Sequence, residues 1–415
     1  MSIKNKTMNQ KDTSFEKQGI VIFAMSIFAS GLNYLFQIVS GRILDPVLYG
    51  ELNSLFSIIN ILAVIGNSLG LSIVKYVAEM QDDLGANVRK IFRQCFIVAI
   101  PLSVLIVLVM TCLMHYNIWS SIFTTLSIVS TGLAFILYGV LQGKKRFFQV
   151  GIYNMLQPVS KMVIGTVLLL IGLHYNSVLI AMSAGAVIAM LYAHNCMKNE
   201  MEKTSPENNE TVKNIYKYFL FTLVSMICLT VFNNIDILLV RNYFTEEIVG
   251  QYSSAALFGK IILYIPQALT IMMVPIVAEH KGNEKKTLFK TMGYSLGLAT
   301  CASVGLYVLR KLVITILMGE KYLPSLEYIL PVCVMMLPLV AITVLINYLI
   351  AYGDKWFVTI SSAMGIAGVL VVATLLHTGV SAMIYRISII YAILFVVLFV
   401  RSLTLKPVTN QLNHT

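Results

Sequence analysis

Hydrophobic residues fall in twelve long stretches that short polar segments separate. Each stretch holds about 20 or more residues with few or no charges, the length that an α-helix needs to cross a bilayer. No barrel-type segments of about ten residues with alternating polarity are visible. The pattern therefore predicts an all-α polytopic membrane protein. The predicted spans lie at about residues 20–43, 52–78, 92–114, 118–142, 150–173, 177–197, 215–240, 250–277, 288–309, 326–351, 356–376 and 379–400.

Polar positions in the first half of the chain recur 200 residues later, in one register without gaps, across two spans and the loop between them. Matched pairs include Ser30 and Thr230, Asn33 and Asn233, Gly50 and Gly250, Glu51 and Gln251, Ser54 and Ser254, Asn60 and Lys260, and Asn67 and Gln267. This indicates a duplicated architecture of two pseudo-symmetric lobes. Six spans per lobe, an even number, make the repeat parallel, with its axis along the membrane normal.

A charged segment with one proline separates the two lobes. We predict a cytoplasmic N-terminal segment at 1–18, an N-terminal six-helix lobe at 19–197, a cytoplasmic linker at 198–214, a C-terminal six-helix lobe at 215–404 and a cytoplasmic tail at 405–415.

Four of the spans carry polar side chains at helical spacing, so that the polar residues of each span share one face. These residues are Ser26, Ser30, Asn33, Gln37 and Ser40 in the first span, Asn53, Ser57, Asn60 and Asn67 in the second, Thr222, Ser225, Asn233 and Asp236 in the seventh, and Ser253, Lys260, Tyr264 and Gln267 in the eighth. Amide and charged groups that faced lipid would lack partners, so we expect these faces to line a watery central cavity. The alternative is hydrogen bonding between packed helices.

Four charged residues lie inside predicted spans: Lys161, Asp236, Lys260 and Arg386. Each costs roughly 2.5 to 3.5 kcal/mol at the bilayer centre, so each needs a partner or water. A structural ion pair of Asp236 with Arg241 or Lys260 is one alternative, and snorkelling of Arg386 to the interface is another. Because cations outnumber the single anion, we predict a basic cavity that binds an anionic headgroup through Lys161, Lys260 and Arg386.

The composition agrees with a membrane protein, with 58% hydrophobic and only 12% charged residues. Most of the 30 Lys and Arg residues fall on the side of the N-terminus, which the positive-inside rule places in the cytoplasm together with the C-terminus. The net charge of +11 then faces anionic lipid. No soluble basic module is present, so a nucleic-acid partner is not expected.

The six cysteines lie in or at the ends of spans without paired spacing. They are expected to be small apolar residues and not disulfides or metal ligands. We predict no cofactor and no metal site, and leave open whether Na⁺ or H⁺ couples to transport.

Several segments resemble a known family: Leu44 to Ser57 (LDPVLYGELNSLFS), Gln142 to Phe147 (QGKKRF), Asn233 to Val240 (NNIDILLV), Thr245 to Ser254 (TEEIVGQYSS) and Met318 to Tyr322 (MGEKY). In their order and span context they look like the polysaccharide and O-antigen flippase branch of the multidrug/oligosaccharidyl-lipid/polysaccharide (MOP) exporter superfamily. The resemblance implies a MATE-like fold of twelve helices in two lobes around a central cavity. The first, second, seventh and eighth helices would line its portal.

The resemblance also implies a function without enzymatic catalysis. Such a flippase turns an oligosaccharide repeat unit on undecaprenyl pyrophosphate across the bacterial cytoplasmic membrane by alternating access, for surface polysaccharide synthesis. The expected partners are this lipid-linked substrate, membrane lipids, and the polymerase and glycosyltransferases of the same synthesis. No motif of the family assigns substrate binding to Lys161, Lys260 or Arg386, so those predictions depend on helix position and charge.

Two other classes stay open. A cation-coupled multidrug antiporter of the same fold would use Asp236 to exchange a proton or Na⁺, but it favours an acidic cavity. A polytopic enzyme of envelope glycan synthesis would need catalytic groups on a sizeable outer loop, and the outer segments near 241–250 and 310–327 are short.

Overall fold

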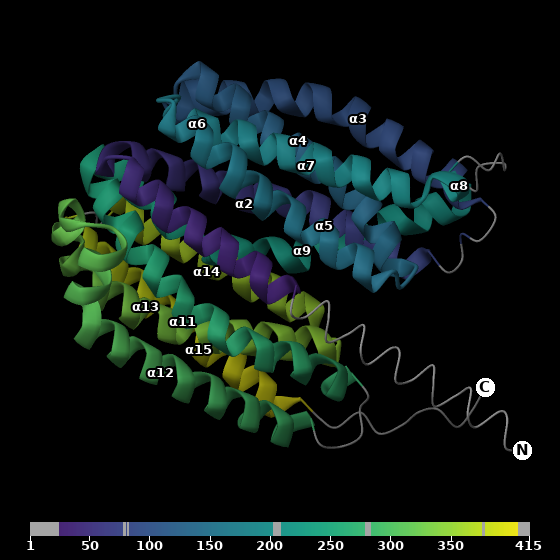
Figure 1. Ribbon diagram of the computed structural model, residues 1–415. Coiled ribbons are helices and arrows are strands. Elements are labelled where there is room, and N and C mark those ends of the chain that lie inside the picture. The colour runs from purple at the N-terminus through teal and green to yellow at the C-terminus, as the bar shows by residue number, and fades with distance from the viewer. Residues whose placement is uncertain are drawn as a thin grey trace, which may run out of the picture. The chain divides into compact units, whose positions relative to one another are not determined.

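The computed structural model describes residues 25–77, 80, 83–201, 209–278, 284–375 and 378–405 (Figure 1). These residues are almost entirely helical and contain no strand. The helices are residues 25–43, α2 (Pro46–Tyr76), α3 (Leu84–Leu108), the π-helical η1 (Val109–Leu113), α4 (Ile118–Gly143), α5 (Phe147–Ser160), the π-helical η2 (Lys161–Gly165), α6 (Thr166–Leu170), α7 (Asn176–Cys196), α8 (Lys198–Met201), α9 (Asn209–Phe232), α10 (Ile235–Tyr243), α11 (Glu246–Ala278), α12 (Glu284–Leu317), the 3-10 helix η3 (Glu320–Ser325), α13 (Leu326–Tyr352), α14 (Lys355–Leu375) and α15 (Val380–Thr404).

Wherever the structure describes a predicted span, the span coincides with helical structure, so the predicted all-α class is confirmed. Within the described residues, nine helices are long and apolar enough to cross a membrane. Large apolar side chains are also exposed along whole helices, such as Ile97 at 60% on α3 and Val308 at 71% on α12. Such surfaces are stable against lipid and not against water, which agrees with a multi-pass membrane protein.

Unit 1 comprises residues 25–44 and 59–223 within the described chain. Its helices α3, α4, α7 and α5 pack against one another along their length (Figure 1). Glycines allow α2 to approach α4 closely, because a Cβ atom on Gly139 would lie 2.3 Å from the Gly70 carbonyl oxygen, and one on Gly66 would lie 2.5 Å from the Gly132 Cα. Small residues at a crossing point are a common basis of helix packing in membranes.

Unit 2 comprises residues 45–58 and 224–405. Helix α13 is its centre: it packs against α11, α12 and α15 and is mostly buried, whereas α12 exposes most of its apolar surface (Figure 1). The first turns of α2 belong to this unit, where Gly50 meets Gly250 of α11.

The seventh predicted span differs from the expectation of one continuous helix. The chain breaks between α9 and α10 at Asn233 and Asn234. Both amide side chains donate to carbonyls four residues earlier, Asn233 to Leu229 at 2.9 Å and Asn234 to Thr230 at 2.8 Å. At Asn234 the backbone N–H bonds the Val231 carbonyl, three residues earlier at 3.0 Å, so the chain leaves the regular helical ladder at this point.

A short helix at the start of the predicted linker packs on unit 1. Glu200 of α8 pairs with Lys144 and Arg146, which follow α4, and the Arg146 guanidinium also donates to the Cys196 carbonyl at 2.5 Å. Arg89 of α3 donates to the Met201 carbonyl. The basic segment at 144–146 therefore holds the end of the sixth span in place.

Candidate functional site

The Asp236 carboxylate occupies the first turn of α10 and is 1% exposed. The hydroxyl of Tyr252, fully buried on α11, donates to one carboxylate oxygen at 2.7 Å. Within the described residues, the other oxygen, Oδ1, accepts no hydrogen bond. The direct partner of Asp236 is thus a neutral hydroxyl, and Arg241 lies instead 4.0 Å from Glu51.

The helix break beside Asp236 is held by a second tyrosine. Tyr391 of α15 donates its hydroxyl to the carbonyl of Phe232, the last residue of α9, at 3.0 Å, and its ring packs edge-on against the Phe232 ring. Carbonyls at a helix end lack partners within the helix, so this hydrogen bond satisfies one of them. Helices α11 and α15 thereby fix the positions of both ends of the break.

Lys260 of α11 points its ammonium group at the same break. Its Nζ lies 3.5 Å from the Asn234 side-chain oxygen, the outer limit of a hydrogen bond, and the Asp236 carboxylate attracts it. The side chain is partly exposed. Unit 2 therefore brings Asp236, Lys260 and Asn234 together in one polar cluster, on helices that the sequence predicts to span the membrane.

Lys161 lies in unit 1, where it begins the π-helical segment η2 in the middle of the fifth predicted span. This segment starts three residues after Pro158, whose missing N–H weakens the regular helical ladder. The flanking Ser160 hydroxyl donates to the Ala181 carbonyl of α7 at 3.2 Å. Single π-helical turns inside α-helices occur often at functional sites. The local backbone geometry therefore keeps Lys161 as a candidate site residue.

Two of the other predicted site residues donate hydrogen bonds to residues nearby in the sequence. The Asn33 amide donates to the Ala29 carbonyl at 3.2 Å, and the Arg386 guanidinium donates to the Thr378 hydroxyl at 3.4 Å. Gln37, Asn67 and Asn233 are partly buried, and Asn60 is exposed. The side chains of Tyr264 and Gln267 lie outside the described residues.

These residues are divided between the units. Asp236, Lys260, Asn233 and Arg386 belong to unit 2, while Lys161 belongs to unit 1. A shared cavity that holds Lys161 and Lys260 together therefore stays a prediction. Among the described residues, no group of three His, Cys, Asp or Glu side chains could hold a metal ion.

Sequence reasoning missed three members of the unit 2 cluster: Asn234, Tyr252 and Tyr391. The Asn-Asn pair was a usable signal, because two adjacent amides within an apolar helix cannot share one face. The tyrosines gave none, since the chain has 21 of them and spacing alone does not show which hydroxyls meet a carboxylate.

The chain is similar in sequence to proteins of polysaccharide biosynthesis. A sequence profile described as polysaccharide biosynthesis protein matches residues 15–281, more than half of the chain. The probable low-salt glycan biosynthesis flippase Agl15 of Haloferax volcanii is 21% identical over 317 residues, which cover 74% of this chain. The match spans 66% of that relative's length, slightly less than two thirds.

Solved structures share the fold. An inward-facing multidrug resistance MATE transporter of the MOP superfamily matches with a TM-score of 0.73 at 12% identity, covering 92% of this chain and 96% of that one. The lipid II flippase MurJ in an inward closed conformation matches with a TM-score of 0.72 at 14% identity, covering 93% and 88%. At such identities the likeness shows the fold alone, and it confirms the predicted MATE-like architecture.

Proposed function

Because the chain belongs to the polysaccharide biosynthesis protein family, we propose that it is a flippase that moves a lipid-linked oligosaccharide across the cytoplasmic membrane. Its substrate in this proposal is a repeat unit on undecaprenyl pyrophosphate, used for surface polysaccharide such as O-antigen. The descriptions of two similar proteins, a glycan biosynthesis flippase and the lipid II flippase MurJ, support transport of a lipid-linked glycan.

The observation that carries the proposal is the place of the Lys260 side chain, on α11 beside the break between α9 and α10, in a helix that the sequence predicts to span the membrane. Its contact with Asn234 is long, at 3.5 Å, and its nearest attracting charge, Asp236, is already bonded to Tyr252. A charge in this position costs roughly 2.5 to 3.5 kcal/mol without water or a partner. A pyrophosphate headgroup would supply a second anion, one that can bond the ammonium directly.

Lys161 and Arg386 are the other cations that we assign to substrate binding. Lys161 is partly exposed in a π-helical turn, and Arg386 is partly exposed on α15. The amides of Asn33, Gln37, Asn60 and Asn67 would line the polar path for the sugars. Sugar hydroxyls can both donate to and accept from amides, which suits such a lining.

The proposed mechanism is alternating access, in which the two lobes rock about the membrane normal. Only the polar headgroup needs the wet passage, since the polyprenyl tail can stay in hydrocarbon. The interrupted helix at Asn233 and Asn234 and the prolines Pro331 and Pro338 inside α13 are the positions where we expect bending.

We further propose that both termini are cytoplasmic, that no catalytic group takes part, and that a polymerase and glycosyltransferases are its partners in synthesis. The test is the lipid fraction of a strain that lacks the gene. The proposal expects one undecaprenyl-linked saccharide to accumulate on the cytoplasmic leaflet while surface glycan is lost. Unchanged lipid-linked saccharides and unchanged glycan would overturn it.

A second candidate is a cation-coupled multidrug antiporter of the same fold. The buried Asp236 carboxylate favours it, because a single acidic group inside the membrane can exchange a proton or Na⁺ for an organic cation. Increased drug susceptibility of the same strain, with normal surface glycan, would support this candidate over the flippase.

A further inference from the structure

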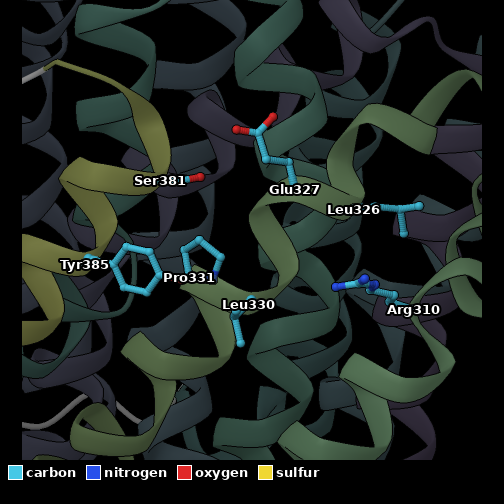
Figure 2. Close-up of a pocket in the computed structure, with 7 residues that line it drawn as sticks. All are labelled: Arg310, Leu326, Glu327, Leu330, Pro331, Ser381 and Tyr385. Atoms are coloured by element: carbon cyan, nitrogen blue, oxygen red, sulfur yellow. The ribbon is translucent and has the colours of Figure 1, made fainter.

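Unit 2 contains a pocket at one end of its helices, between α12, α13 and α15 (Figure 2). Its volume is about 470 Å³. Figure 2 shows α13 in the middle, with Arg310 on one side and Ser381 and Tyr385 on the other. The lining residues are Arg310, Leu326, Glu327, Leu330, Pro331, Ser381 and Tyr385.

The pocket combines one cation and one anion over an apolar wall. Within the described residues, neither Arg310 nor Glu327 takes part in an ion pair; the Arg310 guanidinium lies 4.2 Å from the centre of the Tyr307 ring, and Glu327 is exposed. The Ser381 hydroxyl is buried and has no hydrogen-bond partner in the part of the chain that the structure describes. In the described chain, two charged groups without an ion pair and one hydroxyl without a hydrogen bond thus belong to residues that line the same pocket.

The position of these groups matches the headgroup region of a bilayer. Glu327 and Ser381 are each the second residue of their helices, α13 and α15. Arg310 lies seven residues before the end of α12 at Leu317, about 10 Å at ~1.5 Å per residue, and its long side chain can extend toward the interface. Tyr385 adds an aromatic ring of the kind enriched at the interface.

The pocket is open toward the surface that we assign to lipid. Leu330 is 41% and Tyr385 is 37% exposed at its rim. An occupant can therefore present apolar chains to this rim and a polar group to the charged residues. A free sugar or a soluble ion would leave the apolar rim uncovered.

We propose that this pocket binds a zwitterionic phospholipid whose headgroup carries a primary ammonium, as in phosphatidylethanolamine. The phosphate contacts Arg310, whose planar guanidinium suits phosphate oxygens, and the ammonium donates to the Glu327 carboxylate. The Ser381 hydroxyl donates to a phosphate or ester oxygen. The acyl chains lie against Leu330 and the Tyr385 ring.

This assignment distinguishes among common lipids. An anionic headgroup such as phosphatidylglycerol would satisfy Arg310 but leave Glu327 facing a net negative charge. A choline headgroup keeps the positive charge but has no N–H to donate to the carboxylate. The site does not depend on the proposed flippase function, since Lys161, Asp236 and Lys260 are not among its lining residues.

The test is lipid binding to the full-length protein, purified in mild detergent, stripped of lipid and titrated with phosphatidylethanolamine, phosphatidylcholine and phosphatidylglycerol of identical acyl chains. Native mass spectrometry reports the bound fraction of each. We expect phosphatidylethanolamine to bind about tenfold more tightly than the other two, the value of one charge-assisted hydrogen bond. E327Q should abolish this preference, and R310Q should weaken the binding of all three lipids.

Two matched variants control for general charge effects. K311Q and E320Q remove exposed charges that lie near Arg310 and Glu327 in the sequence but do not line the pocket, and both should keep the wild-type preference. If R310Q fails to fold, R310K keeps the charge but loses the guanidinium fork and should weaken binding partially.

If the E327Q protein still prefers phosphatidylethanolamine, the proposal is overturned. It is also overturned if E320Q loses this preference to the same extent as E327Q. Displacement of the lipid by a neutral oligosaccharide would also overturn it, because the pocket would then be a glycan site.

Discussion

Gly50 of α2 and Gly250 of α11 pack backbone against backbone, and a Cβ atom on Gly50 would lie 2.5 Å from the Gly250 nitrogen. The two glycines are equivalent positions of the 200-residue repeat. Both positions need glycine for the same reason, since any side chain would enter the facing backbone.

This contact predicts that G250A is strongly destabilising. Its Cβ would lie 1.7 Å from the Pro46 carbonyl oxygen, which is backbone and cannot move aside as a side chain would. We expect a loss of about 1 to 3 kcal/mol or more, typical of overpacking, measured as lower thermal stability in detergent. G293A on exposed α12 is the control, because nothing lies within 4 Å of its Cβ and stability should be unchanged or slightly higher.

A second prediction concerns the two membrane-embedded lysines. K260Q and K161Q should each reduce flipping of a fluorescent lipid-linked saccharide in proteoliposomes about tenfold or more, because each removes one charge-assisted contact to the headgroup. K290Q, an exposed lysine of α12, is the matched control and should transport normally. Wild-type rates from both K260Q and K161Q, at equal reconstitution, would contradict their assigned roles.

Much of the fold was predictable because lipid imposes one simple rule. Backbone groups must bond within the helix, so length and apolarity alone locate the spans. The same rule does not locate interruptions. The seventh span is interrupted at Asn233 and Asn234, where the Asn234 N–H bonds the Val231 carbonyl and Tyr391 of a distant helix bonds the Phe232 carbonyl, and hydropathy encodes neither contact.

The candidate site was predictable only in part, for a related reason. Lys260 and Asp236 stand out as charges in apolar helices, and the structure brings them to the same break. The partner of Asp236 could not be foreseen: charge suggested Arg241 or Lys260, whereas helix packing supplies Tyr252. Burial favours a neutral donor here, because it satisfies the carboxylate without bringing a second charge out of water.

A third prediction concerns the attachment of α8. Glu200 bridges Lys144 and Arg146, and its side chain is only 24% exposed. E200Q should weaken this attachment because it removes the charge from both contacts. We expect faster proteolysis between residues 198 and 214, measured by peptide mapping. E210Q at the start of α9 is the control, and equal cleavage rates in E200Q and wild-type protein would show that the ion pairs do not hold α8.

The last prediction is a coupling between Tyr252 and Asp236. Y252F removes the hydroxyl that donates to the carboxylate at 2.7 Å and leaves a buried acidic group without that partner. An unsatisfied buried group costs about 1 to 3 kcal/mol, more for a charged one, so thermal stability should fall. D236N keeps the shape of the side chain but removes the charge that makes the hydrogen bond strong.

The double variant separates this contact from general packing. If the hydrogen bond carries the effect, Y252F should destabilise the D236N protein much less than the wild type, with a coupling free energy above about 0.5 kcal/mol. Y328F is the matched control, because the Tyr328 ring packs 6.1 Å from the Tyr252 ring without a hydrogen bond to Asp236 among the described contacts. If the stability loss of the double variant equals the sum of the losses in Y252F and D236N, the two groups act independently.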